Sequence, residues 1–157
     1  MRSFNHTEIE RKIFFDPELV FFIDNSIDRD ALIFKLTEEL ANKGKIAAQA
    51  PFYNAVLERE KLTSTGIGHG IAIPHAKLAD LEEFFIAIAL LREKGIDWGA
   101  IDGSEVRIVL LIGGPTNRQA DYLHILSEIT QILQKEGIQE KLLLSHSSED
   151  VVKHLSL

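Results

Sequence analysis

The chain has 157 residues, of which 45% are hydrophobic and 26% charged, a balance typical of one water-soluble globular domain. Its 24 acidic and 17 basic residues give a net charge of -7 without any Lys/Arg-rich run, which argues against direct nucleic-acid binding. The absence of cysteine excludes disulfides, thiolate zinc sites and cysteine nucleophiles.

The hydropathy pattern predicts neither a targeting segment nor a membrane-spanning one. Residues 1–22 alternate between polar and apolar types, which is not the pattern of a signal peptide. The longest apolar run, at 84–91, is too short to cross a bilayer. We therefore expect a cytoplasmic protein without direct membrane insertion.

In chain order, turn signals and hydrophobic periodicity predict strands that alternate with helices. A turn at Asp16-Pro17 precedes the first strand, and Gly113-Gly114-Pro115 is expected to end the last one. The predicted strands cover 19–23, 84–91 and 106–112. The predicted helices cover 26–42, 51–61, 117–135, 138–144 and 148–155. Strands of continuous apolar character interleaved with amphipathic helices predict an α/β fold, a single-domain sandwich with a mixed β-sheet flanked by helices.

Two of these helices have a clear apolar stripe at helical spacing. In the first helix the stripe is Leu32, Leu36 and Leu40, and Gly44 is the expected stop. In the helix over 117–135 the stripe is expected to be Leu123, Leu126, Ile129 and Leu133, with His124 beside it. Trp98, in a glycine-bounded loop, is expected to anchor packing.

The segment TGIGHGIAIPHAK at 65–77 has glycines at alternate positions, followed by a proline and a histidine. A nucleotide-binding phosphate loop is disfavoured, because no Lys-Ser or Lys-Thr follows the glycines and no helix begins there. A dinucleotide-binding loop is disfavoured because Gly66, Gly68 and Gly70 form G-x-G-x-G and not G-x-G-x-x-G. His69 and His75 could converge on a metal ion, but no further ligands complete a shell. We expect no metal and no cofactor.

The pattern instead favours a nucleophilic histidine in a pocket of backbone amides. The three glycines allow a close approach of N–H groups to an anion, and Pro74 stiffens the chain that presents His75. A neutral imidazole offers a free lone pair near pH 7 and forms a phosphoramidate that can be passed on. The alternative from these residues alone is a turn with a solvent-facing histidine.

The run Arg59-Glu60, followed by STGIG at 64–68 and GIAIPH at 70–75, resembles a known phosphorylation-site signature. It is similar to that of the fructose/mannitol-type IIA domains of the bacterial sugar phosphotransferase system, and most similar to the nitrogen-regulatory IIA proteins. The order of strands and helices agrees with this family from about residue 13 to the C-terminus. The resemblance therefore implies one IIA domain over 1–157, with its core at about 13–157.

The resemblance implies roles for three side chains. His75 matches the histidine that is phosphorylated on Nε2. Arg59 matches an arginine that helps to hold the phosphoryl group, a task suited to its planar fork of donors. His124 matches a second histidine that packs against the active one. Its helix face is therefore expected to look towards His75, where its imidazole would donate a hydrogen bond to the incoming phosphate.

Three further residues are candidate modulators of the site. Glu60 either orients Arg59 or is solvated. His69 stands where the family usually has Asn or Glu, and Ala76 stands where glycine is frequent after the histidine. His69 either adds a hydrogen-bond donor near the phosphate or faces solvent. Both departures leave the groups needed for phosphoryl transfer in place, and both could alter the transfer rate or partner choice.

The resemblance implies that the phosphoryl donor is the histidine-containing phosphocarrier protein HPr or its nitrogen-branch relative. Three functions remain open at this point. The first is a regulatory IIA of the nitrogen type that controls target proteins through its phosphorylation state. The second is a sugar-transport IIA that hands the phosphoryl group to a IIB domain of a fructose- or mannitol-like permease. The third is a regulatory binding module without phosphotransfer.

Overall fold

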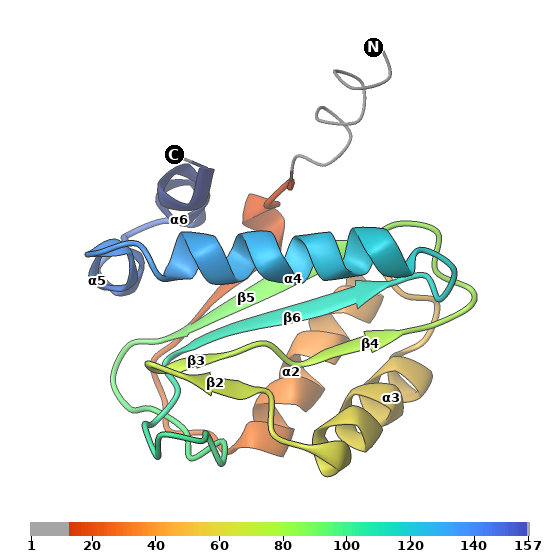
Figure 1. The fold of residues 1–157 in the computed structure, drawn as a ribbon, viewed down its shortest axis with the longest axis horizontal. Coiled ribbons are helices and arrows are strands. Elements are labelled where there is room, and N and C mark those ends of the chain that lie inside the picture. Colours follow the sequence, from red (N-terminus) through yellow and green to blue (C-terminus); the bar gives the residue numbers. More distant parts are fainter. Residues whose placement is uncertain (1–12, 157) are drawn as a thin grey trace, which may run out of the picture.

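The computed structural model describes residues 13–156, which form a mixed α/β sandwich, as the sequence predicted (Figure 1). The central sheet follows the order β1-β5-β6-β3-β2, and β4 pairs with β6 beyond the end of β3. Among the strand pairs formed within residues 13–156, β5–β6 and β2–β3 are antiparallel and the others are parallel. The strands are β1 (Val20–Ile23), β2 (Gly66–Gly68), β3 (Ile71–Ala72), β4 (His75–Lys77), β5 (Phe85–Leu91) and β6 (Ile108–Gly114).

Helices cover both faces of the sheet, so β5 and β6 are buried on both sides (Figure 1). The alternation along β5 shows this: Ala87 and Ala89 pack with α2 and α3, whereas Ile88 and Leu90 pack with α4, α5 and α6. This two-sided burial explains why the sequences of both strands are continuously apolar. The helices are η1 (Pro17–Leu19), α2 (Arg29–Asn42), α3 (Gln49–Leu62), α4 (Gln119–Leu133), α5 (Ile138–Leu143) and α6 (Ser148–Ser156).

Some predicted boundaries were wrong by a few residues. The first helix begins at Arg29, because the carboxylate of Asp28 accepts a hydrogen bond from the amide of Ala31 at 2.8 Å. Strand β6 continues through Gly113 and Gly114. A Cβ at Gly113 would overlap the ring of Phe85, so the glycine serves close packing here and does not end the strand.

The apolar stripe of α4 is shifted by one residue from its predicted position at the start of the helix. Tyr122 is buried there, whereas Leu123 is 54% exposed. Ile129 and Leu133 are buried as expected. Trp98 is 2% exposed and belongs to the core between the sheet and α2–α3, which confirms its role as a packing anchor.

The edge of the sheet next to β6 is interrupted at Pro74, and this break positions His75. The amide of Ile73 turns away from β6 and donates to the carbonyl of Thr65, while the carbonyl of Pro74 accepts from the amide of Ile112. Strand β4 then begins at His75 opposite Ile112. Helix α3 packs against β4, so its C-terminal turn lies close to the histidine. None of the helices within residues 13–156 has the length and apolar character that a bilayer crossing requires.

Candidate functional site

His75 is half-buried at the first position of β4 and is held by its own backbone. Its Nδ1 lies 2.9 Å from the carbonyl oxygen of Ile73. A carbonyl oxygen can only accept a hydrogen bond, so Nδ1 carries the proton and Nε2 keeps a free lone pair. The local backbone therefore fixes the tautomer in which Nε2 is the nucleophilic atom.

Burial and nearby cations keep the His75 ring neutral. Desolvation is the largest cause that lowers the pKa of His75 below 6.5, and the positive charges of Arg59 and Lys77 act in the same direction. The hydrogen bond to Ile73 and the negative charge of Glu60 oppose this shift. Arg59 lies on the last turn of α3 and donates from Nη1 to the carbonyl of Thr63 at 3.0 Å. The same cations that disfavour an imidazolium would favour an anion on the ring.

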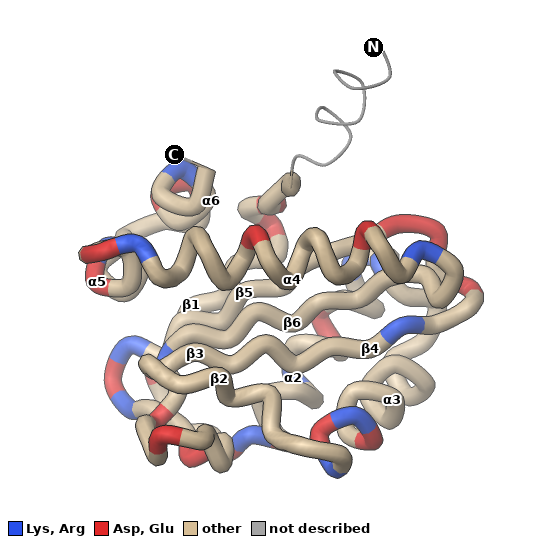
Figure 2. Tube along the Cα trace, in the orientation of Figure 1, with Lys and Arg blue, Asp and Glu red and all other residues tan. Residues whose placement is uncertain are grey.

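Lys77 is a cation of the site that the sequence analysis did not single out. Residues two apart on a strand point to the same face, so Lys77 and His75 share one side of β4. The Nζ of Lys77 lies 4.8 Å from the centroid of the Tyr122 ring, and it hydrogen-bonds Oε1 of Gln119. Figure 2 shows Lys or Arg positions on both elements next to the histidine, β4 and α3. The i, i+2 spacing from His75 was the signal that could have identified Lys77.

An aromatic contact joins the His75 ring to α4. The Tyr122 and His75 ring centroids are 5.3 Å apart with the planes inclined by 59°. Phe84 stacks on Tyr122 at 6.4 Å and 18°, and the guanidinium of Arg118 lies 5.3 Å from the Phe84 ring centroid. Gly114 permits this arrangement, because a Cβ there would overlap the Phe84 ring. Tyr122 was missed in the sequence because the apolar stripe of its helix was placed on Leu123.

His124 has a different position from the one expected. It lies two residues after Tyr122, and residues two apart on a helix do not face the same way. Its side chain lines a cavity of about 280 Å³ with Phe84, Arg118 and Asp121. Within residues 13–156 the ring contact of His75 is made by Tyr122, and no hydrogen bond or ring contact joins His124 to His75. The hydrogen-bonding role of His124 stays a prediction.

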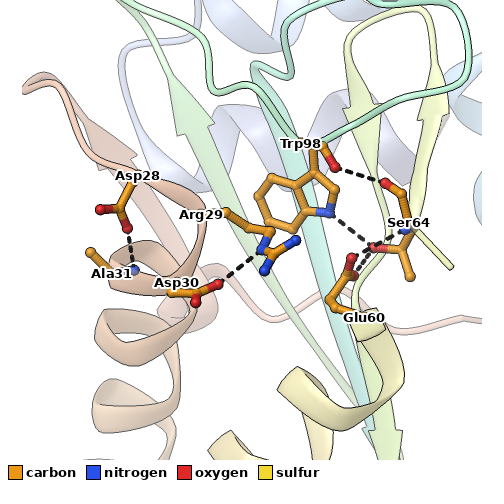
Figure 3. A network of polar contacts seen from close by, with 8 residues as sticks. Asp28, Arg29, Asp30, Ala31, Glu60, Ser64 and Trp98 are labelled. Atoms are coloured by element: carbon orange, nitrogen blue, oxygen red, sulfur yellow. Dashed lines mark hydrogen bonds and ion pairs between the residues drawn. The ribbon is translucent and has the colours of Figure 1, made fainter. Parts of the chain in front are cut away.

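Glu60 is buried, so the expectation that it is solvated was wrong, and no hydrogen bond or ion pair joins it to Arg59 among the described residues. It is 6% exposed and accepts hydrogen bonds from the amide of Thr65, at 3.3 Å, and from the Thr65 hydroxyl. The indole Nε1 of Trp98 donates to that hydroxyl at 3.1 Å, and the Ser64 hydroxyl donates to the Trp98 carbonyl at 2.8 Å (Figure 3). This network ties the end of α3 to the start of β2.

The glycines of the motif form a hairpin and do not surround His75. Along β6, Ile71 pairs with Ile108 and His75 with Ile112, which separates them by about 13 Å at 3.3 Å per residue. Gly68 and Gly70 precede β3 and are farther away still. Gly66 pairs with Ala72, again on the far side of Pro74. The structure therefore does not place the predicted phosphate nest at the histidine.

The amides of this hairpin already have partners. The Gly66 amide donates to the Ser64 hydroxyl at 3.0 Å, and the Gly70 amide donates to the Ser104 hydroxyl at 3.2 Å. His69, with a φ of 58°, donates its amide to a carboxylate oxygen of Asp102 at 3.0 Å. The His69 side chain is exposed at the hairpin turn. We conclude that Asp102 and Ser104, in the loop around residue 103, hold this turn in place.

Ala76, the other departure from the family pattern, points away from the site. It pairs with Gly113 and is buried in the core between the sheet and α2–α3. Its methyl group therefore packs in the interior, while His75 and Lys77 on either side face α4. No cluster of three or more His, Asp or Glu side chains suited to a metal ion occurs within residues 13–156.

The sequence and the fold are both similar to those of known proteins. The family model described as "Phosphoenolpyruvate-dependent sugar phosphotransferase system, EIIA 2" matches residues 13–157. The chain belongs to this family. Its assignment confirms the resemblance seen in the sequence and makes the chain a phosphoryl-carrying component of phosphotransferase type.

Among relatives of this EIIA chain, a nitrogen regulatory protein of Bradyrhizobium diazoefficiens is 37% identical over 105 residues, covering 67% of this chain and 68% of the relative. A fructose-specific EIIA component of Haloferax volcanii is 32% identical and covers 85% and 86%. The crystal structure of IIA-Ntr from Neisseria meningitidis superposes with a TM-score of 0.80 at 26% identity, covering 88% and 93%.

A further similarity concerns fold alone. The NMR structure of a complex of enzyme IIAMTL and phosphorylated enzyme IIBMTL from Escherichia coli matches the EIIA chain with a TM-score of 0.76. The identity is 22%, and the match covers 91% of this chain and 97% of that one. It confirms the mixed α/β sandwich.

Proposed function

We propose that this EIIA protein accepts a phosphoryl group on Nε2 of His75 and acts as a nitrogen-regulatory-type phosphocarrier. The observation that carries the proposal is the 2.9 Å contact between His75 Nδ1 and the carbonyl of Ile73, which leaves Nε2 unprotonated. The donor is a phosphohistidine carrier, HPr or its nitrogen-branch relative. The EIIA protein is the acceptor in a transfer between two histidines.

The chemistry requires alignment and charge stabilisation more than acid–base catalysis. Nε2 of His75 attacks the phosphorus of the carrier's phosphohistidine, and the new N–P bond forms as the donor N–P bond breaks. The bonding electron pair returns to the donor nitrogen, and the proton on His75 Nδ1 stays in place. Arg59 and Lys77 offset the charge on the equatorial oxygens. The lowered pKa of His75 keeps the ring in the reactive neutral form.

Phosphorylation by a purified, phosphorylated carrier tests this proposal. We expect one acid-labile, base-stable phosphoryl group per chain, mapped by mass spectrometry to His75, and complete loss of labelling in His75→Ala. His146→Ala is the matched control, because His146 is exposed and lies in the segment between α5 and α6. Labelling that persists in His75→Ala would show that another residue is the acceptor.

The regulatory assignment is favoured over sugar transport by two relatives. The 37% identical protein is named a nitrogen regulatory protein, and the structure with the TM-score of 0.80 is IIA-Ntr. The transport alternative has its own support in the 32% identical fructose-specific EIIA component and in the IIAMTL–IIBMTL complex. In the transport alternative, a IIB domain is the next acceptor.

Two measurements separate the regulatory and transport functions from each other and from a non-transferring binding module. Transfer from phosphorylated protein to purified fructose- or mannitol-type IIB domains is expected to be absent for a regulator and rapid for a transport component. Affinity capture with unphosphorylated and phosphorylated protein should yield partners that depend on the phosphoryl group. A binding module would show capture without any labelling of His75. Cytoplasmic localisation is part of this proposal.

A further inference from the structure

The hydroxyl of Tyr122 is a buried polar group without a hydrogen-bond partner among residues 13–156. The whole residue is 4% exposed. A buried hydroxyl without a partner is destabilising, because its interaction with water has been lost and nothing replaces it. It is the one buried side-chain oxygen or nitrogen in the described range with this property. Such a group in a native fold needs an explanation, and a ligand that accepts its hydrogen bond is one.

The position of Tyr122 identifies where that ligand would sit. The Tyr122 ring contacts the His75 ring with 5.3 Å between the centroids. The Nζ of Lys77 lies 4.8 Å from the centroid of the Tyr122 ring. Arg59 acts electrostatically on both the phenol of Tyr122 and the imidazole of His75. The Tyr122 side chain therefore belongs to the same cluster as the proposed nucleophile and its two cations. The positive charges of Arg59 and Lys77 suit an anion.

The phenol would act as a donor and not as an anion. Burial raises the pKa of Tyr122 above its ordinary value of 10, so the hydroxyl keeps its proton throughout the neutral range. A phosphoryl group has three strong acceptor oxygens. A hydrogen bond from a neutral hydroxyl to a charged oxygen is stronger than one between two neutral groups.

We propose that the Tyr122 hydroxyl donates a hydrogen bond to the phosphoryl group that His75 carries on Nε2. This inference rests on the proposed function and assigns the direct contact to Tyr122, whereas the resemblance assigns it to His124. No proton is transferred in this step: Oη keeps its hydrogen, the N–P bond forms at His75 as the carrier's N–P bond breaks, and Tyr122 stabilises the oxygens. The unmet donor of the free protein is satisfied only in the phosphorylated form.

The substitution Tyr122→Phe tests this, because it removes the hydroxyl and keeps the ring that packs on His75 and Phe84. We expect the rate of phosphorylation by the carrier to fall about tenfold, and the half-life of the phosphohistidine to shorten. The unphosphorylated variant should be as thermally stable as the wild type or more stable, since no hydrogen bond is lost. The stabilisation on phosphorylation should be smaller in the variant.

Tyr53→Phe is the matched control, because Tyr53 is half-buried on α3 with its ring against Phe34. It removes the same group from another part of the fold and should leave rate and half-life unchanged. A purely structural role for Tyr122 would instead lower the stability of both forms and leave the phosphohistidine half-life unchanged. Equal rates and half-lives in Tyr122→Phe and wild type, with His75 still labelled, would overturn this inference alone. A wild-type protein not labelled at His75 would overturn the proposed function and this inference together.

Discussion

The Nδ1 atom of His75 lies 2.9 Å from the carbonyl oxygen of Ile73, two residues earlier in the same chain. The Ile73 amide donates to the Thr65 carbonyl and not to β6, so the polar groups of Ile73 lie on the side of the strand away from β6. The motif thus contains both the nucleophile and the acceptor that fixes its tautomer.

The first prediction concerns the titration of His75. Since burial is the largest cause that lowers its pKa, the ring stays neutral in the folded protein at pH values just below 6.5, where the unfolded chain binds a proton. The rate of phosphorylation should therefore hold constant as the pH falls through 6.5 and decrease only at lower pH. The unfolded state binds more protons there, so folding stability contributed by this group falls as the pH drops below 6.5.

Histidine NMR spectra recorded across pH 4 to 8 measure this directly. The His75 resonances are assigned by their loss in His75→Gln. A ring that titrates at or above 6.5 would contradict the predicted effect of burial and of the two cations. The same titration in phosphorylated protein shows the modified nitrogen, because Nδ1 should remain protonated and bonded to Ile73.

The second prediction concerns the buried carboxylate of Glu60. Glu60→Ala leaves the amide and hydroxyl of Thr65 without their acceptor in a dry environment, which should cost about 2–3 kcal/mol of unfolding free energy. Glu60→Gln keeps one acceptor oxygen and should cost about 1 kcal/mol. Urea denaturation measures both values.

Glu58→Ala provides the control for this prediction on the same helix. Glu58 pairs with Lys61 at 2.9 Å, and both side chains are largely exposed. An exposed pair of this kind contributes about 0–1 kcal/mol. Comparable losses in Glu58→Ala and Glu60→Ala would mean that the Thr65 network does not stabilise the fold as described.

Much of the fold could be predicted because it follows from local patterns. Strands β5 and β6 are buried on both faces, so their sequences are apolar throughout, and α2 has its leucine stripe where the core lies. The end of β6 was mispredicted because Gly113 and Gly114 usually indicate a turn. In this fold they accommodate the rings of Phe85 and Phe84, which are remote in sequence.

The site was only partly predictable for the same reason. His75 stands out through its motif, but the role of the glycines depends on Asp102 and Ser104, more than 30 residues away. Those side chains occupy the amides that the motif alone seemed to offer to an anion. Whether Tyr122 faces the site depends on the rotation of α4 about its axis. A sequence with leucine and isoleucine at neighbouring positions does not fix that rotation.

The third prediction concerns Asp102 and the hairpin turn. Hydrogen bonds from the amide of His69 and from the amide and hydroxyl of Ser104 lower the pKa of the Asp102 carboxyl to about 2. The carboxylate therefore stays ionised at pH 3, and the stability it contributes is present above pH 3.8 and lost as the pH falls through about 2. Carboxyl carbon NMR shifts recorded from pH 1.5 to 6 check this. A midpoint near 3.8 would contradict it.

A substitution of Asp102 also tests whether the hairpin takes part in the phosphorylation of His75. Asp102→Asn should speed hydrogen exchange at the His69 amide, because the charged acceptor is lost. The rate of His75 phosphorylation should stay within about twofold, since the turn is more than about 13 Å from the histidine by strand spacing. A large loss of phosphorylation in this variant would restore the glycine turn as part of the site.

The last prediction concerns Arg59 and uses its neighbour on the same helical turn as a control. Arg59→Met removes a cation that acts on His75 and keeps the apolar stem, so the pKa of His75 should rise towards 6.5. A charge-assisted hydrogen bond contributes about 1.5–3 kcal/mol, and its loss in the transition state slows transfer by roughly 10- to 150-fold.

Lys61→Met removes an exposed cation that pairs with Glu58, and it should change neither the pKa of His75 nor the transfer rate. Arg59 also donates to the Thr63 carbonyl, so thermal unfolding of both variants is needed to separate a loss of helix capping from a loss of transfer. An Arg59→Met variant with wild-type transfer kinetics and an unchanged His75 titration would show that the guanidinium serves the end of α3 and not the phosphoryl group.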